Sequence, residues 1–209
     1  MLFHTPSLAI TFALLLSACS SAHRTQQKNN IENTQHNVAY NILVKTIKAM
    51  PSLEVTVDLR AVYVLTDRYQ SNTHEKELNQ SLINAMASAN WPNCVRKADE
   101  VLELNYTNLN AHYAAIACHF ELDEKKRGQY HEDILNLLLE AIWTTGDGES
   151  AKTAFHITSK TEKEAFIKFH GLHVVKQTVI DFDDQDYDLM TLDDAQNNDV
   201  FEWYFIQNR

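Results

Sequence analysis

The stretch NWPNCVRKADEVLELNYTNLNAHYAAIACHFELDE, residues 90–124, predicts two helices joined by a short turn. Asn90 can cap the first helix with its side-chain oxygen. Trp91 and Pro92 open that helix, because proline is tolerated in the first helical turn. The second helix begins after a turn near Thr107 and Asn108. Two helices so close in sequence predict that this part of the chain forms a helical stack.

The second helix of this stretch has an apolar stripe at the spacing of a tetratricopeptide contact face, formed by Tyr113, Ile116, Ala117 and Phe120. We expect this face to pack against a neighbouring helix, with the small Ala117 permitting close approach. Tyr106 occupies the place of the usual proline, and the chain has no second copy at the ~34-residue period of that repeat. The prediction is therefore tetratricopeptide-like helical pairs.

The apolar period changes along the chain and divides it into two parts. Helical spacing predicts helices at residues 38–50, 59–69, 75–89 and 130–146. Alternation beyond Gly146 predicts strands at residues 153–158, 174–182, 187–192 and 200–206, with one helix at 160–172. The sequence thus predicts a single α+β domain over residues 38–209. Its tetratricopeptide-like helical pairs (38–145) precede a small antiparallel β-sheet with one helix (146–209).

The N-terminus has an apolar run from Leu8 to Leu16, too short for a membrane-spanning helix but of the length of a signal-peptide core. Leu16 to Cys19 resembles a bacterial lipobox, in which the cysteine is acylated. The alternative is an ordinary cleaved signal with an incidental cysteine. We predict a signal peptide at residues 1–18, lipidation of Cys19, and a flexible lipidated tether at residues 19–37.

Ser20 and Ser21 follow this cysteine, which resembles the pattern that sorts lipoproteins to the outer membrane. We therefore expect the protein in the bacterial cell envelope, anchored in the outer membrane by its N-terminal lipid and facing the periplasm.

Acidic residues dominate the charge of the chain, which has a formal net charge of -10. From Val174 to the end, nine acidic residues stand against Lys176 and Arg209. Nucleic acid and anionic lipid surfaces are therefore poor partners.

Residues 144–155, TTGDGESAKTAF, contain two of the four glycines in the chain. A phosphate loop would need a glycine-rich sequence that ends in Gly-Lys-Ser/Thr and runs into a helix, and a calcium loop would need acids at alternate positions. The segment instead predicts a structural turn between a helix and a strand. We expect Gly146 in the left-handed region, a tight turn at Asp147 and Gly148, and hydroxyls of Ser150 or Thr153 bonded to freed backbone groups.

Cys94 and Cys118 form an even pair once Cys19 is acylated, and oxidising compartments favour disulfides. Their positions on two antiparallel helices permit a bridge, and two buried free thiols are the alternative. Zinc would need further ligands from His112, His119 or His131, yet no ligand pair has the usual spacing. We expect neither a metal nor a cofactor.

Several motifs together resemble the bacterial lipoprotein family catalogued as domain of unknown function 4919. They are GDGESAKTAFHIT, EKEAF, LRAVY with a later RY, NAHY, His131, YDLM and FEWYFI, and they span about 170 of the 209 residues. The resemblance implies a shared architecture and supplies no activity.

Two classes of function fit these patterns. The first is a lipoprotein whose helical stack binds a protein or peptide partner, because stacked helix pairs present an extended groove. The second is a cell-envelope enzyme, for example one acting on cell-wall material, with a site between helices and sheet. No catalytic motif is present, so the sequence leans away from an enzyme.

Overall fold

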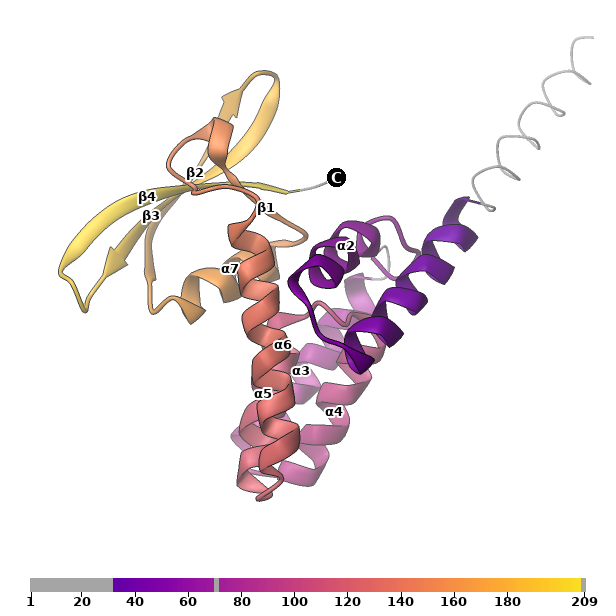
Figure 1. Cartoon of the computed structure of the whole chain (residues 1–209). Coiled ribbons are helices and arrows are strands. Elements are labelled where there is room, and N and C mark those ends of the chain that lie inside the picture. The colour runs from indigo at the N-terminus through magenta and orange to yellow at the C-terminus, as the bar shows by residue number, and fades with distance from the viewer. Residues whose placement is uncertain (1–31, 70–71, 208–209) are drawn as a thin grey trace, which may run out of the picture.

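Residues 32–69 and 72–207 are described in a computed structural model of the chain. The predicted α+β class is confirmed, because helices form the first part and a four-stranded sheet with a helix forms the second (Figure 1). The signal peptide, Cys19 and most of the predicted tether lie outside the described residues. Within these two ranges, no helix is both long and apolar enough to cross a membrane.

The helical half begins with a helix at residues 32–49. It continues through α2 (Leu53–Tyr63), α3 (Asn72–Ala87), α4 (Trp91–Leu104), α5 (Leu109–Glu121) and α6 (Lys125–Trp143). Residues 32–37 are therefore helical, although the sequence analysis assigned them to the tether. They lack an apolar stripe, but a helix already fixed by buried Tyr40 and Ile47 gains one hydrogen bond for each residue added.

Local signals set the helix ends. The side chain of Asn90 accepts a hydrogen bond from the Asn93 amide, so the predicted cap of α4 is confirmed. Asn108 caps α5 in the same way, with the Ala111 amide as donor. Ser52 caps α2, which begins well before the predicted 59–69 and ends at Tyr63. That prediction followed the apolar stripe and overlooked the cap directly after Pro51.

The buried face of α5 is not the predicted one. Ala111, Ala114 and Ala115 are at most 1% exposed, whereas Tyr113 is 46% and Phe120 43% exposed. α5 packs between α4 and α6. The small alanine face allows both neighbours to approach closely. For this reason α5 turns its alanine face, and not its larger apolar stripe, towards α4 and α6.

The second half contains β1 (Phe155–Ile157), α7 (Lys160–Phe169), β2 (His173–Phe182), β3 (Gln185–Asp194) and β4 (Asp199–Gln207). The strand order is β1-β4-β3-β2. β2, β3 and β4 pair antiparallel as predicted, but β1 runs parallel to β4, so the sheet is mixed. Helix α7 connects β1 to β2 at the far edge of the sheet, and the two strands run in the same direction. Two hairpins then reverse the chain twice, so that β4 returns beside β1 and parallel to it.

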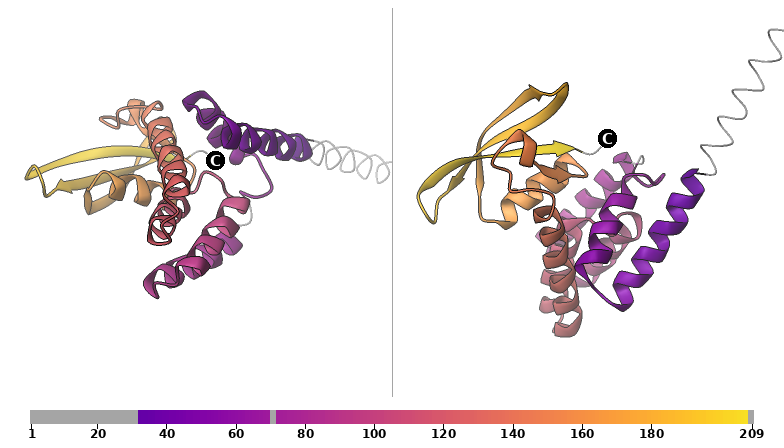
Figure 2. Two further views of the ribbon diagram at one scale, coloured as in Figure 1. Left: turned by 60° about the horizontal axis from the view of Figure 1, so that its bottom comes forward. Right: turned by 45° about the horizontal axis from the view of Figure 1, so that its top comes forward.

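Aromatic side chains join α6 and α7 to the inner face of this sheet. Trp143 of α6, Phe155 of β1, Phe166 of α7 and Trp203 of β4 have ring centroids within 4.9–5.8 Å of one another. The views in Figure 2 place the sheet on one side of the molecule and helix 32–49 on the other. The helical half is therefore accessible over much of its own surface.

Candidate functional site

Two neighbouring cavities lie among the helices. The larger has a volume of about 450 Å³ and is lined by Lys48, Asp99, Leu102, Glu103, Tyr106, Tyr130 and His131. The second, of about 390 Å³, is lined by Val95, Asp99, His119, Lys126, Arg127, Tyr130 and His131. Because both share Asp99, Tyr130 and His131, they form one groove, which we call the His131 groove.

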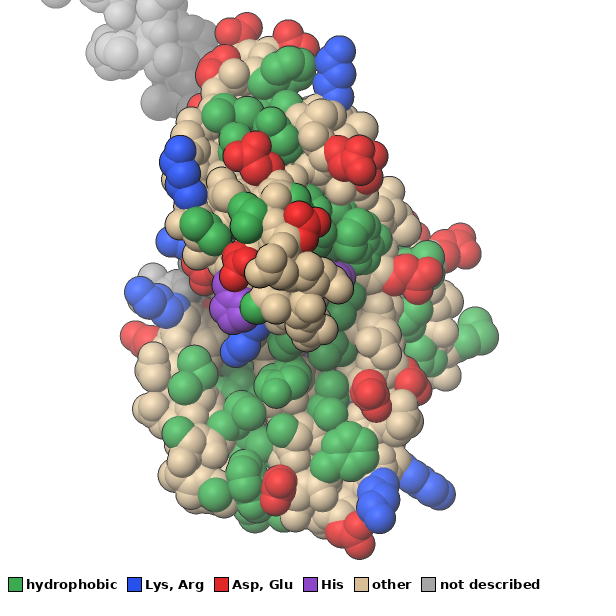
Figure 3. Space-filling model, turned by 90° about the vertical axis from the view of Figure 1, so that its left-hand side faces the viewer, with side chains coloured by type: hydrophobic (Ala, Val, Ile, Leu, Met, Phe, Trp, Pro, Cys, Tyr) green, Lys and Arg blue, Asp and Glu red, His purple; other side chains and the backbone are tan. Residues whose placement is uncertain are grey.

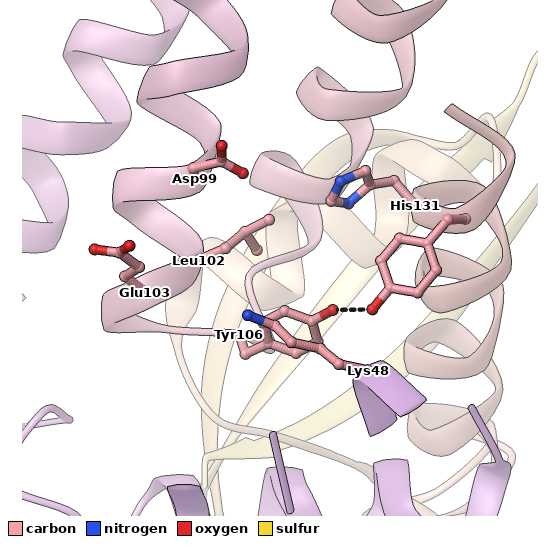
Figure 4. A pocket seen from close by; sticks show the side chains of 7 residues that line it. Lys48, Asp99, Leu102, Glu103, Tyr106 and His131 are labelled. Carbon is pink, nitrogen blue, oxygen red and sulfur yellow. Dashed lines mark hydrogen bonds between the residues drawn. The ribbon is translucent and has the colours of Figure 1, made fainter. Parts of the chain in front are cut away.

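Four elements bring these side chains together. Asp99 and Glu103 are one turn apart on α4, and Tyr106 follows directly in the turn after that helix. Tyr130 and His131 come from the first half of α6, while Lys48 is near the end of helix 32–49. Figure 4 shows Asp99 and His131 on opposite sides of the larger cavity.

Two histidines form a hydrogen-bonded chain behind the groove. His112 Nε2 lies 2.9 Å from the Tyr106 carbonyl oxygen, and His112 Nδ1 lies 3.0 Å from His131 Nδ1. A carbonyl only accepts, so Nε2 of His112 carries the proton and donates. In neutral His112, Nδ1 is then the acceptor, and Nδ1 of His131 must donate to it. Nε2 of a neutral His131 therefore carries a free lone pair.

Burial keeps both imidazoles uncharged. It lowers the pKa of His112 to about 3, with the neighbouring His131 as a second cause. It also lowers the pKa of His131 to about 4, with His119 and Lys48 as further causes. Both rings are consequently neutral at pH 7.

The same groove also presents a carboxylate and two tyrosines. Desolvation raises the pKa of Asp99 and nearby Glu103 adds to the effect, while His119, Lys48 and Arg127 act against it. The hydroxyls of Tyr106 and Tyr130 are 2.5 Å apart, and burial raises the pKa of both (Figure 4). The Lys48 ammonium lies 5.0 Å from the centroid of the Tyr106 ring.

The residues considered for zinc divide into two groups. His112, His119 and His131 lie together, with His119 and His131 stacked at a centroid distance of 5.5 Å. Cys94 and Cys118 instead form a disulfide between α4 and α5, with Cα atoms 6.2 Å apart. In the described part of the chain, no three His, Cys, Asp or Glu side chains are arranged to hold a metal ion.

The turn at residues 146–153 differs in detail from the expected one. Gly148, not Gly146, has a positive φ, of 73°. Gly146 is needed for a different reason, since a Cβ there would lie 2.2 Å from the Thr153 carbonyl oxygen. Asp147 accepts a hydrogen bond from the Glu149 amide at 2.9 Å.

The two hydroxyls of this turn also have other partners than expected. Ser150 and Thr153 bond each other at 2.9 Å, and the nearby Thr153 hydroxyl is the main cause that lowers the pKa of Asp147. Thr145 instead accepts from a freed backbone amide, that of His156. These contacts are all internal to the turn and its strand.

Near the predicted place of an enzyme site, a cavity lies where α3 and the turn between α4 and α5 meet the start of α7. Its volume is only about 10 Å³. Glu75 at its edge accepts hydrogen bonds from Asn105 at 2.9 Å and Asn108 at 2.8 Å. These contacts leave little room for a substrate.

An apolar surface on the helical half is open to solvent. It consists of Ile83 and Met86 on α3 with Tyr113, Ile116, Ala117 and Phe120 on α5, and we call it the α3–α5 surface. Ile83 is 57% exposed, and α3 and α5 are in contact. Figure 3 shows apolar side chains spread over the helical half below the sheet.

Sequence patterns indicated His131 and the α5 stripe, but they did not indicate Lys48, Asp99 and Tyr130 as cavity residues. The spacing of Asp99 and Glu103 places both on one face of α4, which is the signal available for them. No pattern in the sequence around Lys48 indicates that this residue lines the same cavity as Asp99.

Residues 25–208 match the family described as Domain of unknown function (DUF4919), and the chain belongs to this family. Comparisons with curated proteins and with solved structures find no match.

Proposed function

We propose that this protein is a periplasm-facing outer-membrane lipoprotein that binds a polypeptide partner through the α3–α5 surface. The observation that carries the proposal is the exposure of Ile83, Tyr113 and Phe120 on two neighbouring helices. Large apolar side chains grouped on one surface are typical of a protein interaction site.

The spacing of the stripe on α5 favours an amphipathic helix as the bound element. Tyr113, Ile116, Ala117 and Phe120 are at i, i+3, i+4 and i+7, the pattern with which one helix contacts another. The Tyr113 ring packs at a tilt against the ring of Phe169 in α7, at a centroid distance of 5.3 Å, which fixes one end of the stripe. Ile116 and Ala117 lie between the two aromatic residues and are half-buried, so they can contact a helix of the partner as part of the same stripe.

The lipobox-like sequence before Cys19 supports the proposed anchor, and the Cys94–Cys118 disulfide supports an oxidising compartment. Cys19→Ala is expected to abolish incorporation of radiolabelled palmitate and to release the protein from membranes. Cys94→Ala is the control, because it removes a cysteine without touching the anchor. Continued labelling of the Cys19 variant would refute the lipoprotein assignment.

Site-specific photo-crosslinking in intact cells tests the partner. A photoreactive side chain at Tyr113 is expected to give one defined protein adduct, and the same group at Arg96 on α4 is expected to give none. Ile83→Glu places a charge on the exposed apolar surface and should abolish the adduct. Gln80→Glu adds the same charge elsewhere on α3 and should retain it. An adduct insensitive to Ile83→Glu would contradict the proposed surface.

The second candidate is a cell-envelope enzyme, favoured by one observation in the His131 groove. The raised pKa of Asp99 and the neutral His131 are a pair of titratable groups in one cavity, a combination found in active sites. Release of soluble fragments from purified cell-wall material by the wild type, and not by Asp99→Asn, would favour this candidate over the binding protein.

A further inference from the structure

We infer that the His131 groove binds a small molecule carrying a protonated primary amine. The groove shares no residue with the α3–α5 surface. It rests on two hydrogen-bond acceptors that line both cavities and lack partners among the described residues.

The first acceptor is Nε2 of His131. The chain from the Tyr106 carbonyl through His112 fixes the proton of neutral His131 on Nδ1. His131 is only 8% exposed, yet it lines both cavities. The helices therefore hold a lone pair at the wall of the groove in one orientation.

The second acceptor is the Asp99 carboxylate, which faces His131 across the larger cavity (Figure 4). Among residues 32–69 and 72–207, no donor or cation is bonded to Asp99. Its neighbours Arg96 and Lys97 pair with Glu100 at 2.5 and 2.6 Å, and Arg127 pairs with Glu124 at 3.2 Å. Lys48 stands over the Tyr106 ring. Asp99 is thus a carboxylate that the surrounding cations leave unpaired.

A primary ammonium fits these two groups. It offers three donors and a positive charge, so it can bond both the neutral imidazole nitrogen and the carboxylate. A neutral alcohol would leave the charge of Asp99 uncompensated. A bare metal ion would need further ligands that the groove does not offer. Leu102 and the rings of Tyr106 and Tyr130 supply apolar surface for the carbon chain of the amine.

The second cavity suggests where an anionic end of the ligand would lie. Lys126 and Arg127 line it beyond the shared residues Asp99 and His131. An amine linked to a carboxylate, as in an amino acid or a short peptide, would place opposite charges along the groove. A simple amine and an ω-amino acid distinguish the amine site alone from this extended binding mode.

The experiment titrates the full mature protein at pH 7 and follows the side-chain nitrogen resonances of ¹⁵N-labelled histidine. Without ligand, we expect His131 as the Nδ1–H tautomer. Butylamine and 6-aminohexanoate are expected to shift its Nε2 resonance, and 1-butanol and N-acetylbutylamine are expected to leave it unchanged. Tighter binding of 6-aminohexanoate would support the extended mode, and equal affinity would support the amine site alone.

Matched variants test the carboxylate. Asp99→Asn should weaken butylamine binding about tenfold or more, because a charged hydrogen bond is lost. Glu100→Gln removes the same charge from the adjacent residue outside the groove and should leave affinity unchanged. An Nε2–H tautomer, equal loss in both variants, or no shift with any amine up to saturating concentration would overturn the inference.

Discussion

Arg60 in α2 and Glu162 in α7 form a two-pronged ion pair between residues 102 positions apart in the chain. Nε and Nη2 of Arg60 donate to the two carboxylate oxygens at 3.1 and 3.0 Å. Arg60 also donates to the carbonyls of Ala141 and His156, at 3.3 and 2.9 Å. One side chain thereby connects α2, α6, β1 and α7, which makes this pair the main polar link between helices and sheet.

Glu162→Ala is expected to destabilise the protein by roughly 3–5 kcal/mol, since it leaves the Arg60 guanidinium buried without a counter-ion. It also removes the acceptor for the Thr158 amide and hydroxyl. Urea unfolding followed by circular dichroism measures the loss. Glu164→Ala on the same helix is the control, because the exposed pair with Lys160 at 3.7 Å should contribute less than about 1 kcal/mol. Equal effects would contradict the linking role of Glu162.

The Cys94–Cys118 disulfide closes a separation of 24 residues between α4 and α5. Its reduction should lower stability by about 3 kcal/mol through the entropy of the unfolded chain. Alkylation followed by intact-mass measurement should modify neither cysteine before reduction in the denatured protein and both afterwards. Two thiols that are alkylated without reductant would show that the bridge does not form.

The two buried histidines make stability depend on pH. Both folded pKa values, about 3 for His112 and about 4 for His131, are lower than the ordinary value of 6.5. Below about pH 6.5 the unfolded chain therefore binds protons that the folded chain excludes. The contribution of the two neutral histidines to the free energy of unfolding is complete above that pH and declines as the pH falls towards the folded pKa values. Between pH 7 and 5 each histidine should cost about 2 kcal/mol of unfolding free energy.

Urea titrations at pH 7 and 5 measure this decline, and His112→Gln tests its source. Glutamine keeps one donor and one acceptor but does not titrate, so the difference between the two pH values should shrink by one histidine's contribution. An unchanged difference would show that His112 is not excluded from protonation in the folded state.

Local patterns predicted what depends on local chemistry. The cap at Asn90 follows from a few neighbouring residues. So does the connection between the predicted strands 174–182 and 187–192, where Asp183 and Asp184 have the positive φ values, 57° and 59°, of a tight hairpin. The buried face of α5 depends instead on α4 and α6, and the small residues Ala111 and Ala115 outweighed the larger stripe. The parallel pairing of β1 with β4 is also non-local and required the path of the whole second half.

The candidate site was predictable only in part for the same reason. The residue types of His131 and Cys118 marked both as candidates for chemistry, but the residues that they contact are determined by packing. Lys48 and Asp99, more than 50 positions apart, line one cavity because helix 32–49 packs against the turn after α4, where the Tyr40 hydroxyl accepts from the Tyr106 amide at 2.8 Å. A single sequence contains no period or motif that connects them.

The turn between α6 and β1 gives a last prediction, in which two glycines matter and the acid between them does not. Gly148→Ala would place a side chain on a residue with a φ of 73°, and its Cβ would lie 2.4 Å from the Phe155 ring. Ala at 146 would collide with the Thr153 carbonyl, which already accepts from the Gly148 amide at 2.8 Å. Each substitution should cost about 1–3 kcal/mol or more.

Asp147→Ala should cost less than about 1 kcal/mol, because its carboxylate is exposed and its hydrogen bonds can be replaced by water. Thermal midpoints of the three variants, measured beside a cellular phenotype of the anchored protein, separate a turn from a site. If the segment is a turn, phenotype follows stability, and the Gly146 and Gly148 variants fail first. A normally stable Asp147→Ala protein without function would instead make this loop a binding or catalytic site, since no packing loss could then account for the defect.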